Sequence, residues 1–213
     1  MDFRQIAKAL IPVAFESTKQ EFRVRPAQVS AITRQIRRLG HDATYEFPTP
    51  KARDAFLYAA LRYLDPLPHE ELLVAVGARR GSARAAGAAL RRMHRVVGDV
   101  ASVTLTQSVI DLVASAVDTP GGEIVLVHNH PSCLEKSIIR NVIGWTPIPS
   151  DQDRRLAAAL LTPRLRGMLT SARPASLKWY LVDEGEMAEF LLPAIDDIEL
   201  VAERAIADFT REH

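Results

Sequence analysis

Two histidines, a serine and an aspartate have the residue types and the spacing that metal-dependent chemistry needs. His128 and His130 follow the apolar run EIVLV at 123–127, and Ser150 and Asp153 form a Ser-x-x-Asp unit further along the chain. The apolar run comes after a Pro-Gly-Gly turn and predicts a buried strand. Side chains two residues apart on a strand point to one face, so both imidazoles would leave the strand end together. Two imidazoles and one carboxylate leave zinc one open position, as catalytic zinc requires.

Each part of this pattern also has a structural interpretation. A His-x-His pair can simply be the polar end of a strand. Ser150 and Asp153 also fit a capping box, with Ser150 as the N-cap of a helix over residues 154–161. Each part alone favours the structural interpretation, whereas the two together, in this order, favour a metal site.

The combination resembles the JAMM (MPN+) motif of the JAB-domain zinc metalloproteases. The runs HNHPS at 128–132 and PIPSDQD at 147–153 look most like the RadC-like branch of that family. The resemblance covers residues 49–194 and implies that His128, His130 and Asp153 bind Zn²⁺. It also implies that Ser150 donates a hydrogen bond to the oxyanion of a tetrahedral intermediate.

The family also uses a glutamate as general base, at the start of an early core strand and seven positions before a glycine. Glu70 stands at that distance from Gly77, and Glu71 is its competitor. Neighbouring residues on a strand point to opposite faces, so only one of the two carboxylates can reach the metal. We favour Glu70.

The segment between the two parts of the motif departs from the family pattern. Pro131 and Ser150 are further apart than the short loop usual in the family, and residues 133–149 are rich in apolar side chains. We predict that this insertion contacts the substrate or gates the metal; a satellite helix that fills a gap in the core is the alternative. Cys133 is interpreted as a small buried thiol, although a thiolate could also occupy the open zinc position.

Composition limits the class of protein. The chain has 213 residues, of which 47% are hydrophobic, a formal net charge of +1 and one cysteine. This net charge favours neither nucleic acid nor a membrane as a partner. One cysteine allows no internal disulfide, which suits a reducing compartment. No signal peptide or membrane span is recognisable, so a cytoplasmic location is expected.

The order of predicted elements indicates an α/β (α+β) fold, in which a central mixed β-sheet is flanked by helices. A helical extension is expected over residues 1–48, the JAB/MPN-like domain over 49–194 and a C-terminal helix over 195–213. Within the domain we expect a helix starting at Thr49-Pro50, strands at 70–77 and 83–90, a helix capped by Thr106, and a hairpin of 177–182 with 187–192.

Three functions follow from these observations. The resemblance implies a zinc isopeptidase that cuts after the C-terminal tail of a ubiquitin-like protein, in a bacterial antiviral conjugation pathway whose operon supplies partner proteins. The alternatives are a RadC-like nucleic-acid-associated protein, which would use the arginines of residues 23–38 and 79–95, and a non-catalytic MPN scaffold. No helix-hairpin-helix pattern is present, which disfavours a role in DNA repair.

Overall fold

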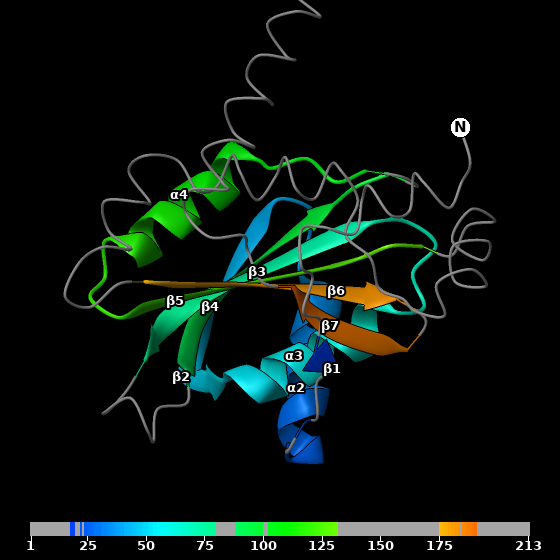
Figure 1. Ribbon diagram of the computed structural model, residues 1–213, viewed down its shortest axis with the longest axis horizontal. Coiled ribbons are helices and arrows are strands. Elements are labelled where there is room, and N and C mark those ends of the chain that lie inside the picture. Colours follow the sequence, from blue (N-terminus) through cyan, green and yellow to red (C-terminus); the bar gives the residue numbers. More distant parts are fainter. Residues whose placement is uncertain are drawn as a thin grey trace, which may run out of the picture.

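The computed structural model describes residues 18–19, 22, 24–79, 88–99, 102–131, 175–183 and 185–190 (Figure 1). Helices and strands are interspersed along this part of the chain. In chain order they are β1 (Thr18–Lys19), α2 (Pro26–Arg38), β2 (Ala43–Ala52), α3 (Arg53–Leu64), β3 (Glu71–Arg79), β4 (Ala88–Val97), α4 (Gln107–Val117), β5 (Gly122–Asn129), β6 (Ser176–Asp183) and β7 (Glu186–Phe190).

The strands form one mixed sheet in the order β1-β7-β6-β5-β3-β4-β2. Strands β5 and β6 are parallel, and the other described neighbours are antiparallel. Helices α2 and α3 cover one face of the sheet, and α4 covers the other (Figure 1). The predicted α+β fold with a central mixed sheet between helices is therefore confirmed.

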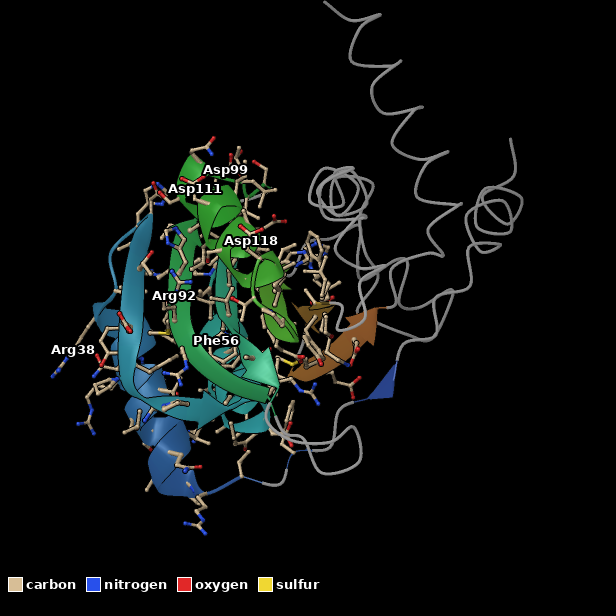
Figure 2. All side chains as sticks on the ribbon, turned by 90° about the vertical axis from the view of Figure 1, so that its left-hand side faces the viewer. Arg38, Phe56, Arg92, Asp99, Asp111 and Asp118 are labelled. Atoms are coloured by element: carbon tan, nitrogen blue, oxygen red, sulfur yellow. The ribbon has the colours of Figure 1, made fainter. Side chains whose placement is uncertain are left out.

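Alternation along β3 divides the core into two layers. Leu73 packs with Ile32 and Phe56 on the α2/α3 side, whereas Leu72 packs with Val113 on the α4 side. Figure 2 labels Phe56 in the interior, Arg38 at α2, and Asp99, Asp111 and Asp118 at the opposite side of the molecule, around α4. Every residue of β5 is buried, which explains why its sequence is a continuous apolar run rather than an alternating one.

The starts of helices α2 and α4 agree with the residues that favour helix N-termini. Pro26 is in the first turn of α2, which buries Val29, Ile32 and Ile36. The Thr106 hydroxyl accepts a hydrogen bond from the Val109 N–H and caps α4, as predicted. Helix α4 buries Val109, Leu112 and Val113, whereas Ile110 is 44% exposed.

The helix predicted to begin at Thr49-Pro50 begins instead at Arg53, because residues 43–52 form β2. Prolines remove ladder donors, and β2 can hold Pro48 and Pro50 because it lies at an edge of the sheet. The β2–β4 register shifts between Glu46 and Lys51, where these prolines lie. The domain boundary expected after residue 48 falls inside β2, which pairs with β4, and buried residues of α2 pack in the same core as Phe47 of β2.

Two strand predictions differ in their outcome. Strand β4 contains residues 88–90 of the strand predicted at 83–90 and extends to Val97, where Met93 and Val96 are buried, and residues 83–87 lie outside the described ranges. The predicted hairpin near the end of the domain is confirmed as β6 and β7. The helices expected near residues 3–10 and 195–213, and the helix after Ser150, lie outside the described residues. None of the described helices has the length and apolar character that a membrane crossing requires.

Candidate functional site

The two histidines meet at the carboxyl end of β5. His128 and His130 are 0% and 8% exposed, and their Nε2 atoms are 3.1 Å apart. Leu126 packs on the α4 side of the sheet, and alternation places both imidazoles on that same side. The structure therefore brings together the two side chains that the sequence singled out.

The distance between the two nitrogens has two chemical interpretations. It suits a hydrogen bond between the rings. It also suits a shared metal, because two nitrogens bound to tetrahedral zinc at about 2.0–2.1 Å lie about 3.3 Å from each other. In the hydrogen bond the N–H of one ring points at the other nitrogen, whereas around a metal the lone pairs of both nitrogens converge on the ion.

Trp179 on β6 determines which ring nitrogen of a neutral His128 carries the proton. The indole Nε1–H donates to His128 Nδ1 over 2.8 Å, and both side chains are buried. Because an indole nitrogen only donates, Nδ1 accepts, and a neutral His128 carries its proton on Nε2 facing His130. A metal at Nε2 needs the lone pair there, so that proton must move to Nδ1 and the Trp179 bond must be given up. Sequence analysis missed Trp179, because only the parallel pairing of β6 with β5 brings it here.

Glu70 precedes the first residue of β3, next to the strand end that carries the histidines. The β3–β5 ladder ends with Leu72 paired to His128, and alternation from Leu72 places Glu70 on the face of the sheet that His128 also faces. The Glu70 backbone accepts from the Gly98 N–H and donates to the Asp99 carbonyl, each over 2.8 Å, which prolongs the pairing of β3 with β4. Glu70 is half-buried. Alternation along β3 thus favours Glu70 over Glu71 as the carboxylate on the side of the histidines, and its role as a base stays a prediction.

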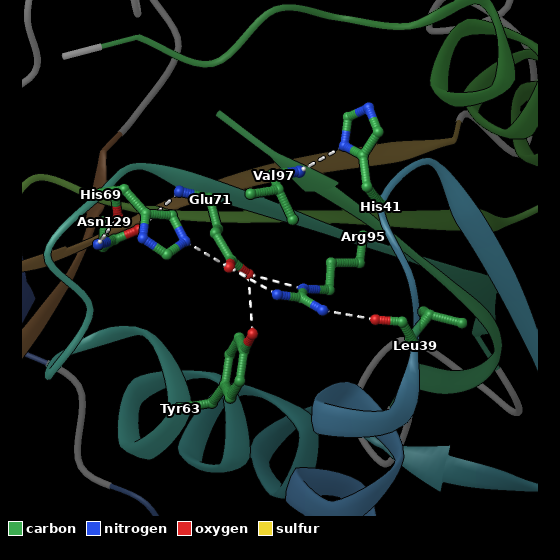
Figure 3. Close-up of polar contacts among 8 residues, drawn as sticks. All are labelled: Leu39, His41, Tyr63, His69, Glu71, Arg95, Val97 and Asn129. Atoms are coloured by element: carbon green, nitrogen blue, oxygen red, sulfur yellow. Dashed lines mark hydrogen bonds and ion pairs between the residues drawn. The ribbon is translucent and has the colours of Figure 1, made fainter. Parts of the chain in front are cut away.

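Glu71 points to the other face and belongs to a buried polar cluster (Figure 3). Arg95 donates to both carboxylate oxygens, from Nε over 2.8 Å and from Nη2 over 2.7 Å. The Tyr63 hydroxyl donates over 3.0 Å, and His69 Nε2 lies 2.8 Å from Oε1. This cluster joins α3, β3 and β4, so the geometry gives Glu71 a structural role.

The electrostatics of Glu71 agree with that role. Burial alone would raise the pKa of the Glu71 carboxyl, but hydrogen bonds from Arg95 and His69 and the charge of Arg95 outweigh burial and hold the pKa below its ordinary value. Burial raises the pKa of Tyr63, so its hydroxyl stays protonated and can donate to the carboxylate.

The other predicted site residues, Ser150, Asp153 and Cys133, lie outside the described residues, as does the whole 133–149 insertion. Within the described ranges, no group of three or more His, Cys, Asp or Glu side chains is arranged to hold a metal ion. The described residues thus supply two of the three predicted ligands. No family model, no curated protein and no solved structure matches the chain.

We predict that Glu71→Gln destabilises the fold in a pH-dependent way. The folded pKa of Glu71 is lowered, so its ion pair contributes stability above the unfolded pKa, and that contribution is lost as pH falls through the folded pKa. At neutral pH the substitution should cost about 3–5 kcal/mol of unfolding free energy, because Arg95 loses its buried partner. Urea unfolding between pH 7 and pH 3 measures both effects.

The matched control is Glu46→Gln, which removes an exposed carboxyl on β2. It should leave the unfolding free energy and its pH dependence at wild-type values. If the Glu71→Gln and wild-type curves run parallel from pH 7 to pH 3, Glu71 does not stabilise the fold through its charge.

Proposed function

We propose that this chain is a zinc-dependent isopeptidase of the JAMM type. The observation that carries the proposal is the buried pair His128 and His130 at a strand end, with Glu70 placed by alternation from Leu72 on the same face of the sheet. The nitrogen spacing of 3.1 Å and the burial of both rings support a metal held between them. Asp153 is the third ligand in this proposal, by resemblance.

The residues of the chain have separate tasks in the proposed reaction. Bound zinc supplies Lewis-acid chemistry and lowers the pKa of a water molecule. Glu70 accepts a proton from the attacking water and returns it to the leaving amine. Ser150 donates a hydrogen bond to the developing oxyanion. Burial of the two histidines limits the access of bulk water to the reacting atoms.

The proposed substrate is a bond after the extended C-terminal tail of a ubiquitin-like protein. Strand β5 is paired on one side with β3 and on the other with β6, so a tail has no free edge of β5 to add to. It must instead approach across the strand ends where the histidines and Glu70 lie. We place this activity in the cytoplasm, in a bacterial antiviral conjugation pathway with partner proteins from the same operon.

A second candidate function, nucleic-acid binding, is favoured by one observation. Ser30, Thr33, Arg34, Arg37 and Arg62 line an open hollow of about 320 Å³ between α2 and α3. These helices cover the face of the sheet opposite the histidines, so binding there would be independent of the metal chemistry. The formal net charge of +1 argues against strong non-specific binding.

The proposal predicts about one zinc per chain in the purified protein, as in mononuclear sites with three protein ligands. Metal analysis of the wild type and of Asp153→Ala tests it. The variant should lose most of its zinc because a carboxylate ligand is gone. Equal zinc in both proteins would remove Asp153 from the site, and a wild type that takes up no added zinc would refute the metal centre.

Glu70→Ala should lower kcat about 10²–10⁴-fold while zinc content stays unchanged, because a general base is not a ligand. The assay uses a fluorescent reporter in which a peptide ending in Gly-Gly is joined to a lysine side chain. Glu46→Ala, which removes an exposed carboxylate on β2, is the control and should keep wild-type kcat. Wild-type kcat in Glu70→Ala would show that another group accepts the proton.

Trp179→Phe should tighten zinc binding about five- to tenfold. The indole N–H would no longer favour the tautomer with the proton on His128 Nε2, and one such hydrogen bond is worth about 1 kcal/mol. Tyr180→Phe is the control, because it removes a hydrogen bond to Glu189 from the next residue of β6. Zinc titration with a competing chelator measures both. Weaker binding in Trp179→Phe would mean that the indole supports the metal-bound ring.

A further inference from the structure

Asn129, between the two histidines, points to the opposite face of the sheet and is 2% exposed. Its side-chain Oδ1 accepts a hydrogen bond from the Glu71 N–H over 2.9 Å, and its Nδ2 donates to the His69 carbonyl over 3.0 Å (Figure 3). Both partners are backbone groups. The amide of Asn129 therefore continues the β3–β5 ladder by one step, acting as a peptide group would, at the point where β5 ends.

The two backbone groups that Asn129 binds stand on either side of Glu70 in the sequence. The backbone groups of Glu70 itself are bound on the other side of β3, where its N–H donates to Asp99 and its carbonyl accepts from Gly98. The backbone around Glu70 is thus held from both sides, by the backbone after β4 and by one side chain of β5. Leu72 with His128 is the last pair of the β3–β5 ladder at this end, so the two hydrogen bonds of the Asn129 side chain extend the contact between the strands beyond that pair.

Residues 69–71, which Asn129 binds, also have hydrogen bonds that do not involve Asn129. The Glu71 carboxylate is bound by Arg95 and Tyr63, and its Oε1 lies 2.8 Å from His69 Nε2. On the other side of β5, the His130 N–H donates to the Val182 carbonyl over 3.2 Å. Asn129 therefore joins two segments that each have other hydrogen bonds, and loss of its own hydrogen bonds would loosen their connection beyond the end of the β3–β5 ladder.

From this geometry we infer that Asn129 is a positioning residue that holds Glu70 opposite the histidine pair. The inference rests on the proposed function for the roles of Glu70, His128 and His130. Only a side chain that donates and accepts can satisfy both backbone groups at this reach. Aspartate keeps the acceptor for the Glu71 N–H but sets an oxygen against the His69 carbonyl, and alanine leaves both buried groups unpaired.

The test compares Asn129→Ala and Asn129→Asp with the control Thr44→Val, which removes a side-chain hydrogen bond to the buried His94 between β2 and β4. Melting temperature should fall in Asn129→Ala and in Thr44→Val. Only the Asn129 variants should lose function: kcat on the Gly-Gly lysine reporter at saturating zinc should fall about 10–100-fold, the usual effect of removing a group that orients a metal site. Asn129→Asp should lie between alanine and the wild type.

Hydrogen exchange gives a readout that does not depend on zinc or on hydrolysis. The Glu71 amide should exchange at least about tenfold faster in Asn129→Ala, and at the wild-type rate in Thr44→Val, because its acceptor is the Asn129 side chain. Wild-type exchange at Glu71 in Asn129→Ala, or wild-type kcat at saturating zinc, would overturn the positioning role. A wild-type protein that neither binds zinc nor cleaves the reporter would refute the proposed function instead, and the exchange rate would still decide whether Asn129 holds the 69–71 segment.

Discussion

Strand β5 is buried along its whole length, so every polar side chain on it must find hydrogen-bond partners inside the protein. Arg53 of α3 reaches Glu123 at the start of the strand over 3.0 Å. His128 is bound by Trp179 and lies against His130, and Asn129 is bound to the backbone that begins β3. Satisfying these groups fixes the neighbours of β5 at both of its ends, and the arrangement of the candidate site follows from this.

The buried structural carboxylate and the candidate catalytic residues lie on opposite faces of the sheet. At the junction of β3 and β5, Glu71 and Asn129 face α2 and α3, whereas alternation places Glu70 and the histidines on the α4 side. The buried Glu71–Arg95 pair joins β3 to β4 on the α2/α3 side, so a slip of β3 by one residue against β4 would turn Glu71 to the other face and separate the pair. The structural cluster around Glu71 thus holds that carboxylate on the face opposite the histidines, and Glu70 is the carboxylate that the proposed chemistry would use.

Local sequence was enough to predict β5, α2, the Thr106 cap, the β6–β7 hairpin and the pairing of the two imidazoles, since each depends on spacing within one element. Local sequence could not predict the features that depend on contacts with a distant segment of the chain. The prolines of β2 are acceptable only because tertiary pairing places that strand at an edge. Trp179 and Arg95 reach their partners through β6 and β4, and nothing near His128 or Glu71 in the sequence indicates either contact.

The same atom, Nε2 of His128, serves both the fold and the proposed chemistry. With its proton on Nε2, the ring donates to His130 and accepts from Trp179, so two buried nitrogens are satisfied by protein groups alone. With zinc on Nε2, the proton moves to Nδ1 and the indole N–H must find another acceptor, because both groups would then be donors. In the proposed zinc site, metal affinity would therefore depend on the hydrogen-bond partner of His128 Nδ1 as well as on the ligands, and Trp179 is that partner in this structure.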